Sequence, residues 1–339
     1  MTIQRPTVEY THVSAEIFEN EIVPQNRPAI LRRLVAHWPA VQAGLESPQT
    51  LCAYLKRFDQ GVPAESLLAE AVSDGKFFYS EDLRGFNFRK SKLSIGAFLD
   101  RLLASAAEPS APAMYIQSAP IPMHLPRFDE QNVNPLLARS IFPRIWIGNA
   151  VTATTHSDLA NNIACSIAGR RRFTFFPPQA LRNLYIGPLE FSPAGRPVSM
   201  VDLDAPDLAR YPKFAAALES AEVAELEPGD AVYIPYYWWH HVRSLDSFNM
   251  LINYWWNDGA VADPGVSPYE ALMLALLTIR DMPSSQRDVW QAIFDHYVFL
   301  RDGDPAAHLP PERRGVLGLL TPQQRSHIKS VLARLLSQN

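Results

Sequence analysis

The stretch 227–244, EPGDAVYIPYYWWHHVRS, carries much of the information about the fold. Pro228-Gly229-Asp230 is typical of a tight turn, and the β-branched and aromatic residues around it predict two short strands, DAVYIP and WWHHVRS. Similar short runs lie before and after it, separated by Pro, Gly and Asn: AMYIQS, RIWIGN, TATTHSD, NIACSIAG, RRRFTFFPP and NMLINYWWN. About eight short strands in succession predict a β-sandwich or barrel over residues 111–260.

The residues on either side of this β region follow other patterns. Before it, we expect helices over 15–23, 47–58 and 94–106, a strand over 28–34 and extended chain over 76–90. Within it, a Pro-rich stretch over 178–227 contains a small helix near 214–221. Beyond Pro264, the segments 267–281, 286–300 and 321–337 are helical in pattern. The fold class is therefore mainly β with α additions: α/β N-terminal elements (1–110), a β core (111–260) and a C-terminal helical segment (265–339).

Composition limits the classes of function. The 339 residues carry 31 Lys and Arg against 35 Asp and Glu, a net charge of −4, so we expect no stable nucleic-acid binding. Cys52 and Cys165 are too far apart in sequence to suggest a disulfide framework, which favours a reducing compartment. We see neither an apolar leader nor an apolar run of membrane-spanning length, and we expect a cytoplasmic protein. The excess of Arg over Lys, with 29 Pro, suggests a bacterial origin.

One short motif can bind a metal. In His156-Ser157-Asp158 the first and third residues share a strand face, so an imidazole and a carboxylate can converge on one ion. Alone this motif is a weak signal. Further along the chain lie His240 and His241, and because neighbours on a strand face opposite ways, only one of them can join the first pair. Two imidazoles and one carboxylate form the facial triad of non-haem Fe(II), although Zn and Mn also accept these ligands.

A second motif can bind an anion. Arg170, Arg171 and Arg172 begin a predicted strand, and alternation places Arg171 on the opposite face from the other two. An arginine that points into a barrel needs an anionic partner, because an unpaired buried charge is costly. A dicarboxylate would be such a partner. A solvated basic face or an internal salt bridge is the alternative.

The segments HSDLANN (156–162), GRRRFTFFPP (169–178), PGDAVYIPYYWWHHV (228–242) and NYWW (253–256), in this order and spacing, resemble the cupin-like JmjC hydroxylases, with an asparaginyl hydroxylase as the nearest pattern. The resemblance implies a double-stranded β-helix (cupin or jelly-roll) core, with Fe(II) bound by His156, Asp158 and His240 and with His241 outside the ligand set. It implies 2-oxoglutarate as cosubstrate.

The resemblance also implies residues of a cosubstrate pocket. Arg171 stands where the family usually has a Lys that binds the distal carboxylate. Further positions that match the pocket are Asn162, Asn253 and Tyr115, with Trp255 as an aromatic beside the iron. The family's Thr three residues before the first His is Ala153 here, and Thr154, on the His156 face, is the candidate substitute.

The function expected from these residues is an Fe(II)- and 2-oxoglutarate-dependent hydroxylase that releases succinate and CO₂. Its substrate would be a protein, an RNA or a small molecule, and a local basic patch of Arg139, Arg144, Arg170, Arg172 and Arg196 would favour RNA. The alternatives are a metal-binding cupin without oxygenase activity, such as a Zn or Mn isomerase or a sensor, and an N-methyl-lysine demethylase.

Three features are open between two roles. The aromatic residues of the β core, Trp238, Trp239, Tyr254, Trp255 and Trp256, suit either a dry pocket or a packed core. Those of 77–88 would line a substrate entrance or pack on the barrel. The C-terminal helices would either form a homodimer or cap the barrel.

Overall fold

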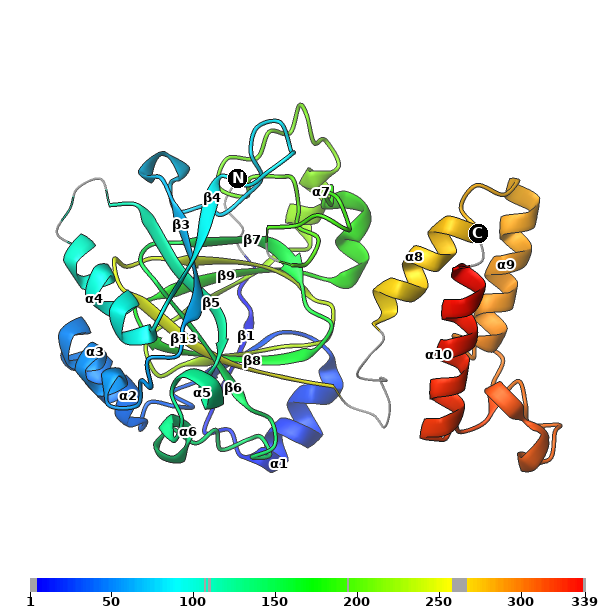
Figure 1. Cartoon of the computed structure of the whole chain (residues 1–339), viewed down its shortest axis with the longest axis horizontal. Coiled ribbons are helices and arrows are strands. Elements are labelled where there is room, and N and C mark those ends of the chain that lie inside the picture. Colours follow the sequence, from blue (N-terminus) through cyan, green and yellow to red (C-terminus); the bar gives the residue numbers. More distant parts are fainter. Residues whose placement is uncertain (1–4, 107, 109–110, 194, 258–266, 338–339) are drawn as a thin grey trace. The chain divides into compact units, whose positions relative to one another are not determined.

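The computed structural model describes residues 5–106, 108, 111–193, 195–257 and 267–337. The chain divides into two compact units, Met1–Asp258 and Gly259–Asn339. Among the described residues, all strands belong to the first unit, and the second contains only helices and turns (Figure 1).

The first unit is built on two β-sheets. In its described residues, the larger sheet has nine strands in the order β1-β2-β11-β8-β13-β6-β5-β3-β4, and the smaller sheet has four in the order β10-β9-β12-β7. The strands are β1 (Val8–Thr11), β2 (Ala29–Arg32), β3 (Ala64–Ala69), β4 (Phe88–Leu93), β5 (Ala113–Pro120), β6 (Pro143–Gly148), β7 (Thr152–Ser157), β8 (Asn161–Ala168), β9 (Arg171–Phe176), β10 (Glu222–Leu226), β11 (Ala231–Ile234), β12 (Trp239–Ser244) and β13 (Asn249–Trp256). The helices are α1 (Ala15–Ile17), α2 (Pro39–Glu46), α3 (Pro48–Lys56), α4 (Ile95–Ser105), α5 (Ile121–His124), α6 (Phe128–Gln131) and α7 (Phe214–Glu219), with the short helical turns η1 (Phe18–Ile22), η2 (Val23–Gln25), η3 (Ala71–Ser73) and η4 (Pro178–Asn183).

An apolar cluster joins the two sheets. It includes Ala164 of β8 and Val232 of β11 from the larger sheet, and Phe173 and Phe175 of β9 from the smaller one. Strands β6, β8, β11 and β13 of the larger sheet and the four strands of the smaller sheet together form the core. This is the double-stranded β-helix expected from the sequence, so the mainly β fold class with α additions is confirmed.

Strand β8 shows why parts of the core are apolar without alternation. Ala164 faces the smaller sheet, whereas Ile163, Cys165 and Ile167 pack in the large cluster that also contains residues of α2, α3 and α4. A strand buried on both faces loses the usual alternation of polar and apolar residues. Each fully buried aliphatic side chain of this kind contributes roughly 1.5–3 kcal/mol to folding. Both cysteines are buried and free.

Several elements of the first unit differ from the sequence predictions. Strands β3 and β10 were not predicted, because AESLLA and EVAEL consist largely of residues that favour helices, and pairing with neighbouring strands overrides that preference. Helix α2 was missed as well. In the segment expected to be extended over 76–90, β4 begins only at Phe88, and turns stand between isolated bridges before it.

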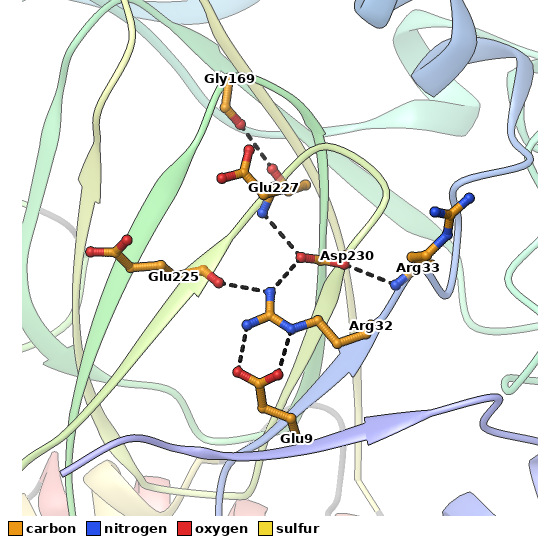
Figure 2. Close-up of polar contacts among 8 residues, drawn as sticks. Glu9, Arg32, Arg33, Gly169, Glu225, Glu227 and Asp230 are labelled. Atoms are coloured by element: carbon orange, nitrogen blue, oxygen red, sulfur yellow. Dashed lines mark hydrogen bonds and ion pairs between the residues drawn. The ribbon is translucent and has the colours of Figure 1, made fainter.

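Arg32 at the end of β2 ties several segments together (Figure 2). Its guanidinium donates two hydrogen bonds to the carboxylate of Glu9 on β1, at 2.9 and 2.5 Å, and one to Oδ2 of Asp230, at 2.6 Å. It also donates to the carbonyl oxygen of Glu225 on β10. Asp230 accepts two further backbone N–H bonds from its surroundings. The Pro-Gly-Asp turn therefore fixes the start of β11 against β1, β2 and β10.

The second unit contains α8 (Pro268–Thr278), α9 (Ser284–Tyr297) and α10 (Pro322–Leu336), with the short turns η5 (Pro311–Arg313) and η6 (Gly315–Leu317). The three helices coincide with the expected segments, apart from their ends. Ser267 and Thr321 begin α8 and α10 with capping boxes. Ala306 is the only apolar residue of the described part of this unit that is buried, whereas Leu277 is 74% exposed. None of the described helices has the length and apolar character needed to cross a bilayer.

Candidate metal centre

Three predicted ligands meet on the smaller sheet. His156 lies near the end of β7 and His240 near the start of β12, and these two residues are direct register partners. Asp158 follows β7. One ligand atom from each residue lies within 4.8 Å of those of the other two, and Nε2 of His240 is 3.7 Å from Oδ2 of Asp158. Two imidazoles and one carboxylate in this arrangement suit a divalent transition metal.

Backbone carbonyl groups set the orientation of both imidazoles. Nδ1 of His156 is 2.8 Å from the carbonyl oxygen of Thr154, and Nδ1 of His240 is 3.0 Å from that of Trp238. Because a carbonyl oxygen can only accept, we assign the proton to each Nδ1, which leaves the lone pair of each Nε2 free for a metal. Metal-binding histidines commonly have such a bond on the far nitrogen.

Burial keeps His240 neutral. Its desolvation, followed by the nearby imidazole of His156, lowers the pKa of His240 to about 4. The neutral imidazole is the form that binds a metal. His241 is also buried, and desolvation lowers its pKa as well, but the charged groups that act on it are Asp204, Asp202, Lys76 and Arg243. His241 is outside the convergent set.

A narrow inner cavity lies between the two sheets beside the triad. Every predicted site residue except Thr154 lines it: His156, Asp158, Asn162, Arg171, Tyr115, His240, Asn253 and Trp255. These side chains come from β5, β7, β8, β9, β12 and β13 and from the residue after β7. The fold thus brings together residues that are far apart in the sequence.

Arg171 is the cationic group of this inner cavity. Its side chain is 2% exposed, and its Nε and Nη2 are buried without a hydrogen-bond partner in the described structure. The Tyr115 hydroxyl bonds to the same guanidinium, and burial lowers the pKa of Arg171. Nε and Nη2 form one edge of a guanidinium, which matches the two oxygens of a carboxylate.

The arginines on either side of Arg171 are surface residues with partners. Arg170 pairs with Asp246 at 2.9 Å, and Arg172 pairs with Glu225 at 2.5 Å. The alternation predicted from the sequence is therefore present. It also weakens the basic patch considered for RNA, because these two charges are neutralised by neighbouring carboxylates.

Side-chain amides line the inner cavity between the triad and the larger sheet. Asn253 donates from Nδ2 to Oδ1 of Asn162 at 3.1 Å and accepts the indole N–H of Trp146 at 2.7 Å. Trp255, two residues beyond Asn253, donates its indole N–H to Oδ2 of Asp158 at 3.1 Å. Trp146 was not predicted, and its only signal in the sequence is its place in the RIWIGN strand.

An irregularity in β7 decides which side chains reach the inner cavity. Val242 of β12 pairs with Ala153, and His240 pairs with His156, so β7 has one more residue than β12 between these pairs. As a result Ala153 lines the inner cavity together with His156. Thr154 instead lines a wider outer cavity, and its hydroxyl is not among the groups around Arg171.

The outer cavity has a volume of about 490 Å³ and reaches His156 and Asp158. A volume of this size is typical of a ligand site. Phe77 belongs to its wall and stacks on Tyr115 with the ring centroids 5.9 Å apart. Phe86 stacks on Phe191 at 4.6 Å. Of the aromatic residues of 77–88, Phe77 thus borders the cavity, while the others pack against neighbouring rings.

The aromatic residues of the β core divide between the two roles that the sequence left open. Trp255 lines both cavities. The others lie in apolar clusters or pack against them: Trp238, Trp239, Tyr254 and Trp256.

Comparisons with known proteins agree with this geometry. The family model described as "Cupin-like domain" matches residues 14–260. The human bifunctional peptidase and (3S)-lysyl hydroxylase JMJD7 is 27% identical over 271 residues, which are 71% of this chain and 80% of that protein. The tRNA wybutosine-synthesizing protein 5 of Danio rerio is 28% identical over 269 residues, 73% of this chain and 74% of that protein. The lysine-specific demethylase JMJ31 of Arabidopsis thaliana is 32% identical over 139 residues, 40% of this chain and 25% of that protein. The resemblance found in the sequence is thus confirmed, and the chain belongs to the family of cupin-like, JmjC-type domains.

Proposed function

We propose that this chain is an Fe(II)- and 2-oxoglutarate-dependent oxygenase that hydroxylates its substrate with release of succinate and CO₂. The ligand set of His156, Asp158 and His240 supports Fe(II) as the metal. The names of two relatives, a lysyl hydroxylase and a lysine-specific demethylase, support an oxidative reaction.

The observation that carries the proposal is the unpartnered edge of Arg171 in a cavity shared with the triad. A buried guanidinium with two free donors is costly unless an anion binds to it. A dicarboxylate such as 2-oxoglutarate would place its distal carboxylate on Nε and Nη2 and its other end at the metal. The small inner cavity, lined by the same residues, favours a short and largely desolvated ligand.

The residues that line the inner cavity would then divide between metal binding, cosubstrate binding and the exclusion of water. The three ligands would hold Fe(II), which when bound supplies the oxidative chemistry with O₂ and the cosubstrate. Arg171 and the hydroxyl of Tyr115 would bind the distal carboxylate. The amides of Asn162 and Asn253 would present polar groups along the cosubstrate, and the apolar cluster around Phe173 would exclude water.

The outer cavity is the proposed substrate site, because it opens beside His156 and Asp158. Apart from these ligands, its described lining contains one acidic residue, Glu65, and one basic residue, Arg196. Such a lining does not favour a polyanion, so we propose a protein side chain as the substrate class, with a nucleobase or a small molecule as the other outcomes of a substrate screen.

The test is an anaerobic titration of metal-free protein with Fe(II) and then with 2-oxoglutarate, followed by visible absorption. We expect a charge-transfer band that saturates with the cosubstrate. Iron binding without this band would instead support a metal-binding cupin with redox-neutral or sensor function, the alternative that Arg171 in place of the family's usual Lys keeps open.

A further inference from the structure

We propose that Arg144 is a positioning residue for the metal centre, which acts through the indole of Trp255 on the carboxylate of Asp158. Arg144 lies on β6 and does not line either cavity beside the triad. The inference rests on the proposed metal-binding function and adds to it a residue that the ligand set does not include.

The indole of Trp255 is hydrogen-bonded to the carboxylate of Asp158. The indole N–H donates at 3.1 Å to Oδ2, the same oxygen that lies 3.7 Å from Nε2 of His240. Asp158 follows the last residue of β7, so no strand pairing fixes its side chain. Its backbone carbonyl accepts the N–H of Tyr237, which fixes the main chain and leaves the carboxylate to be oriented by the indole.

Two further side chains pack against this indole. The guanidinium carbon of Arg144 lies 5.4 Å from the centre of the Trp255 ring, and the ring of Trp146 meets the same indole edge-on at 5.9 Å. A cation against an aromatic face is attracted to it and also polarises the ring, which strengthens the N–H as a donor. Arg144 therefore affects both the orientation of the Trp255 ring and the strength of its bond to Asp158.

Arg144 is itself anchored by its neighbours. Its Nη1 donates to the carbonyl oxygen of Ser118 at 3.1 Å, and its guanidinium also lies 5.1 Å from the ring of Phe142. Among the described residues, no carboxylate forms an ion pair with Arg144, so its charge is not neutralised by a neighbour. Two aromatic rings, together with the carbonyl oxygen and the hydroxyl of Ser118, hold it in place.

The backbone around Ser118, which accepts this bond, departs from regular strand geometry. Ser118 has a φ of +53°, and the pairing of β5 with β6 shifts register between Ile116 and Ala119. Such a bulge redirects the groups of one strand, and bulges are frequent beside functional sites. The contacts thus run from the bulge of β5 through Arg144 and Trp255 to Asp158.

The test measures metal affinity and the spectrum of the bound metal, with Mn(II) as the probe and electron paramagnetic resonance as the readout. Trp255→Phe keeps the ring and removes the N–H, and we expect Mn(II) to bind about 10-fold more weakly, the effect typical of losing a hydrogen bond to a ligand. Arg144→Met should weaken binding several-fold and broaden the spectrum, because the carboxylate samples more orientations. Arg144→Lys keeps the charge and should restore part of the affinity.

A matched control is Trp38→Phe, which also removes a buried indole N–H, but one that is bonded to the carbonyl oxygen of Val133 rather than to a metal ligand. It should leave Mn(II) affinity and the spectrum unchanged. Thermal denaturation of each variant shows whether it is folded, and the lysine variant provides the test if the methionine variant is not.

The outcomes separate the two proposals. If the wild-type protein binds no Mn(II), the proposed function and this inference are both wrong. If the wild type binds Mn(II) and the Arg144 variants bind it with the same affinity and spectrum, only the role of Arg144 is refuted. A loss in Trp255→Phe alone would leave the indole as the positioning group and exclude Arg144.

Discussion

Replacing Arg171 by Met should weaken cosubstrate binding strongly while sparing the metal. The Arg171 guanidinium lines the same inner cavity as the triad, and its Nε and Nη2 have no hydrogen-bond partner among the described residues. It carries the charge that we propose to bind the distal carboxylate of 2-oxoglutarate. Hydrogen bonds to charged groups contribute about 1.5–3 kcal/mol each, so two of them are worth at least about 3 kcal/mol. Since 1.4 kcal/mol is tenfold in affinity, the Kd of 2-oxoglutarate should rise at least ~100-fold.

The same substitution should act differently on stability. In the cosubstrate-free protein, Met removes a buried charge without a carboxylate partner and fills a similar volume, which is neutral or stabilising in such cases. The thermal midpoint of the cosubstrate-free variant should therefore not fall below that of the wild type. This combination of weaker binding and undiminished stability separates an anion-binding role from a structural one.

The assay is calorimetric titration of 2-oxoglutarate into anaerobic protein loaded with Fe(II). Arg172→Met is the control, because Arg172 is the next residue of β9 but pairs with Glu225 at the surface. The control should bind the cosubstrate as the wild type does. A Kd of Arg171→Met within threefold of the wild-type value, or a marked fall in its thermal midpoint without cosubstrate, would refute the reasoning.

Four other substitutions test contacts described above. His156→Ala should lose the metal, measured as the iron retained after gel filtration, while its circular dichroism stays that of the wild type; retained iron would contradict the triad. Arg32→Met removes the guanidinium that pairs with the carboxylate of Asp230, whose side chain is 6% exposed. Because this leaves a buried charge without a partner, the first unit should lose about 3 kcal/mol of stability in chemical denaturation. An unchanged denaturation midpoint would contradict this. The hydrogen bond with Arg170 is the main cause that lowers the pKa of Asp246 in the folded protein. The stability that this pair contributes is therefore present above the pKa of Asp246 in the unfolded chain and is lost as the pH falls through its pKa in the folded protein. Asp246→Asn should flatten the acid side of the curve of stability against pH, and a curve parallel to that of the wild type would count against this role of the pair. Apolar residues exposed on the helices of the second unit are compatible with both roles left open above, a homodimer and a cap on the barrel. We propose the homodimer, so Leu277→Glu should lower the mass found by sedimentation, whereas a wild-type monomer would count against the dimer.

The ligand set and the β core could be predicted because their signals are local and chemically specific. His156-Ser157-Asp158 needs only the alternation of a strand, and the alternation of Arg170, Arg171 and Arg172 follows from the same rule. Pro228-Gly229-Asp230 marks a turn by its residue types alone. In each case the chemistry is visible within a few residues of sequence.

The parts that sequence reasoning missed depend on contacts between distant segments. Strand β3 pairs with β4 and β5, and its Ala, Glu and Leu residues favour a helix until those neighbours are present. In RIWIGN, Arg144 suggests only a member of a basic surface patch, and Trp146 looks like an ordinary strand residue. Their contacts with Trp255 and Asn253 exist only because β6 pairs with β13.

The extra residue of β7 means that the site depends on chain length as well as on residue type. Counting from the pair of Val242 and Ala153, His240 is two residues away on β12, whereas His156 is three residues away on β7. Without the extra residue, the two pairs would stand two residues apart on both strands, so the imidazole of His156 would still lie opposite that of His240. The extra residue therefore adds a side chain to the wall of the outer cavity, where Thr154 lies, without changing the pairing of the ligands. A change of length in this segment would thus alter the proposed substrate site before it altered the metal centre.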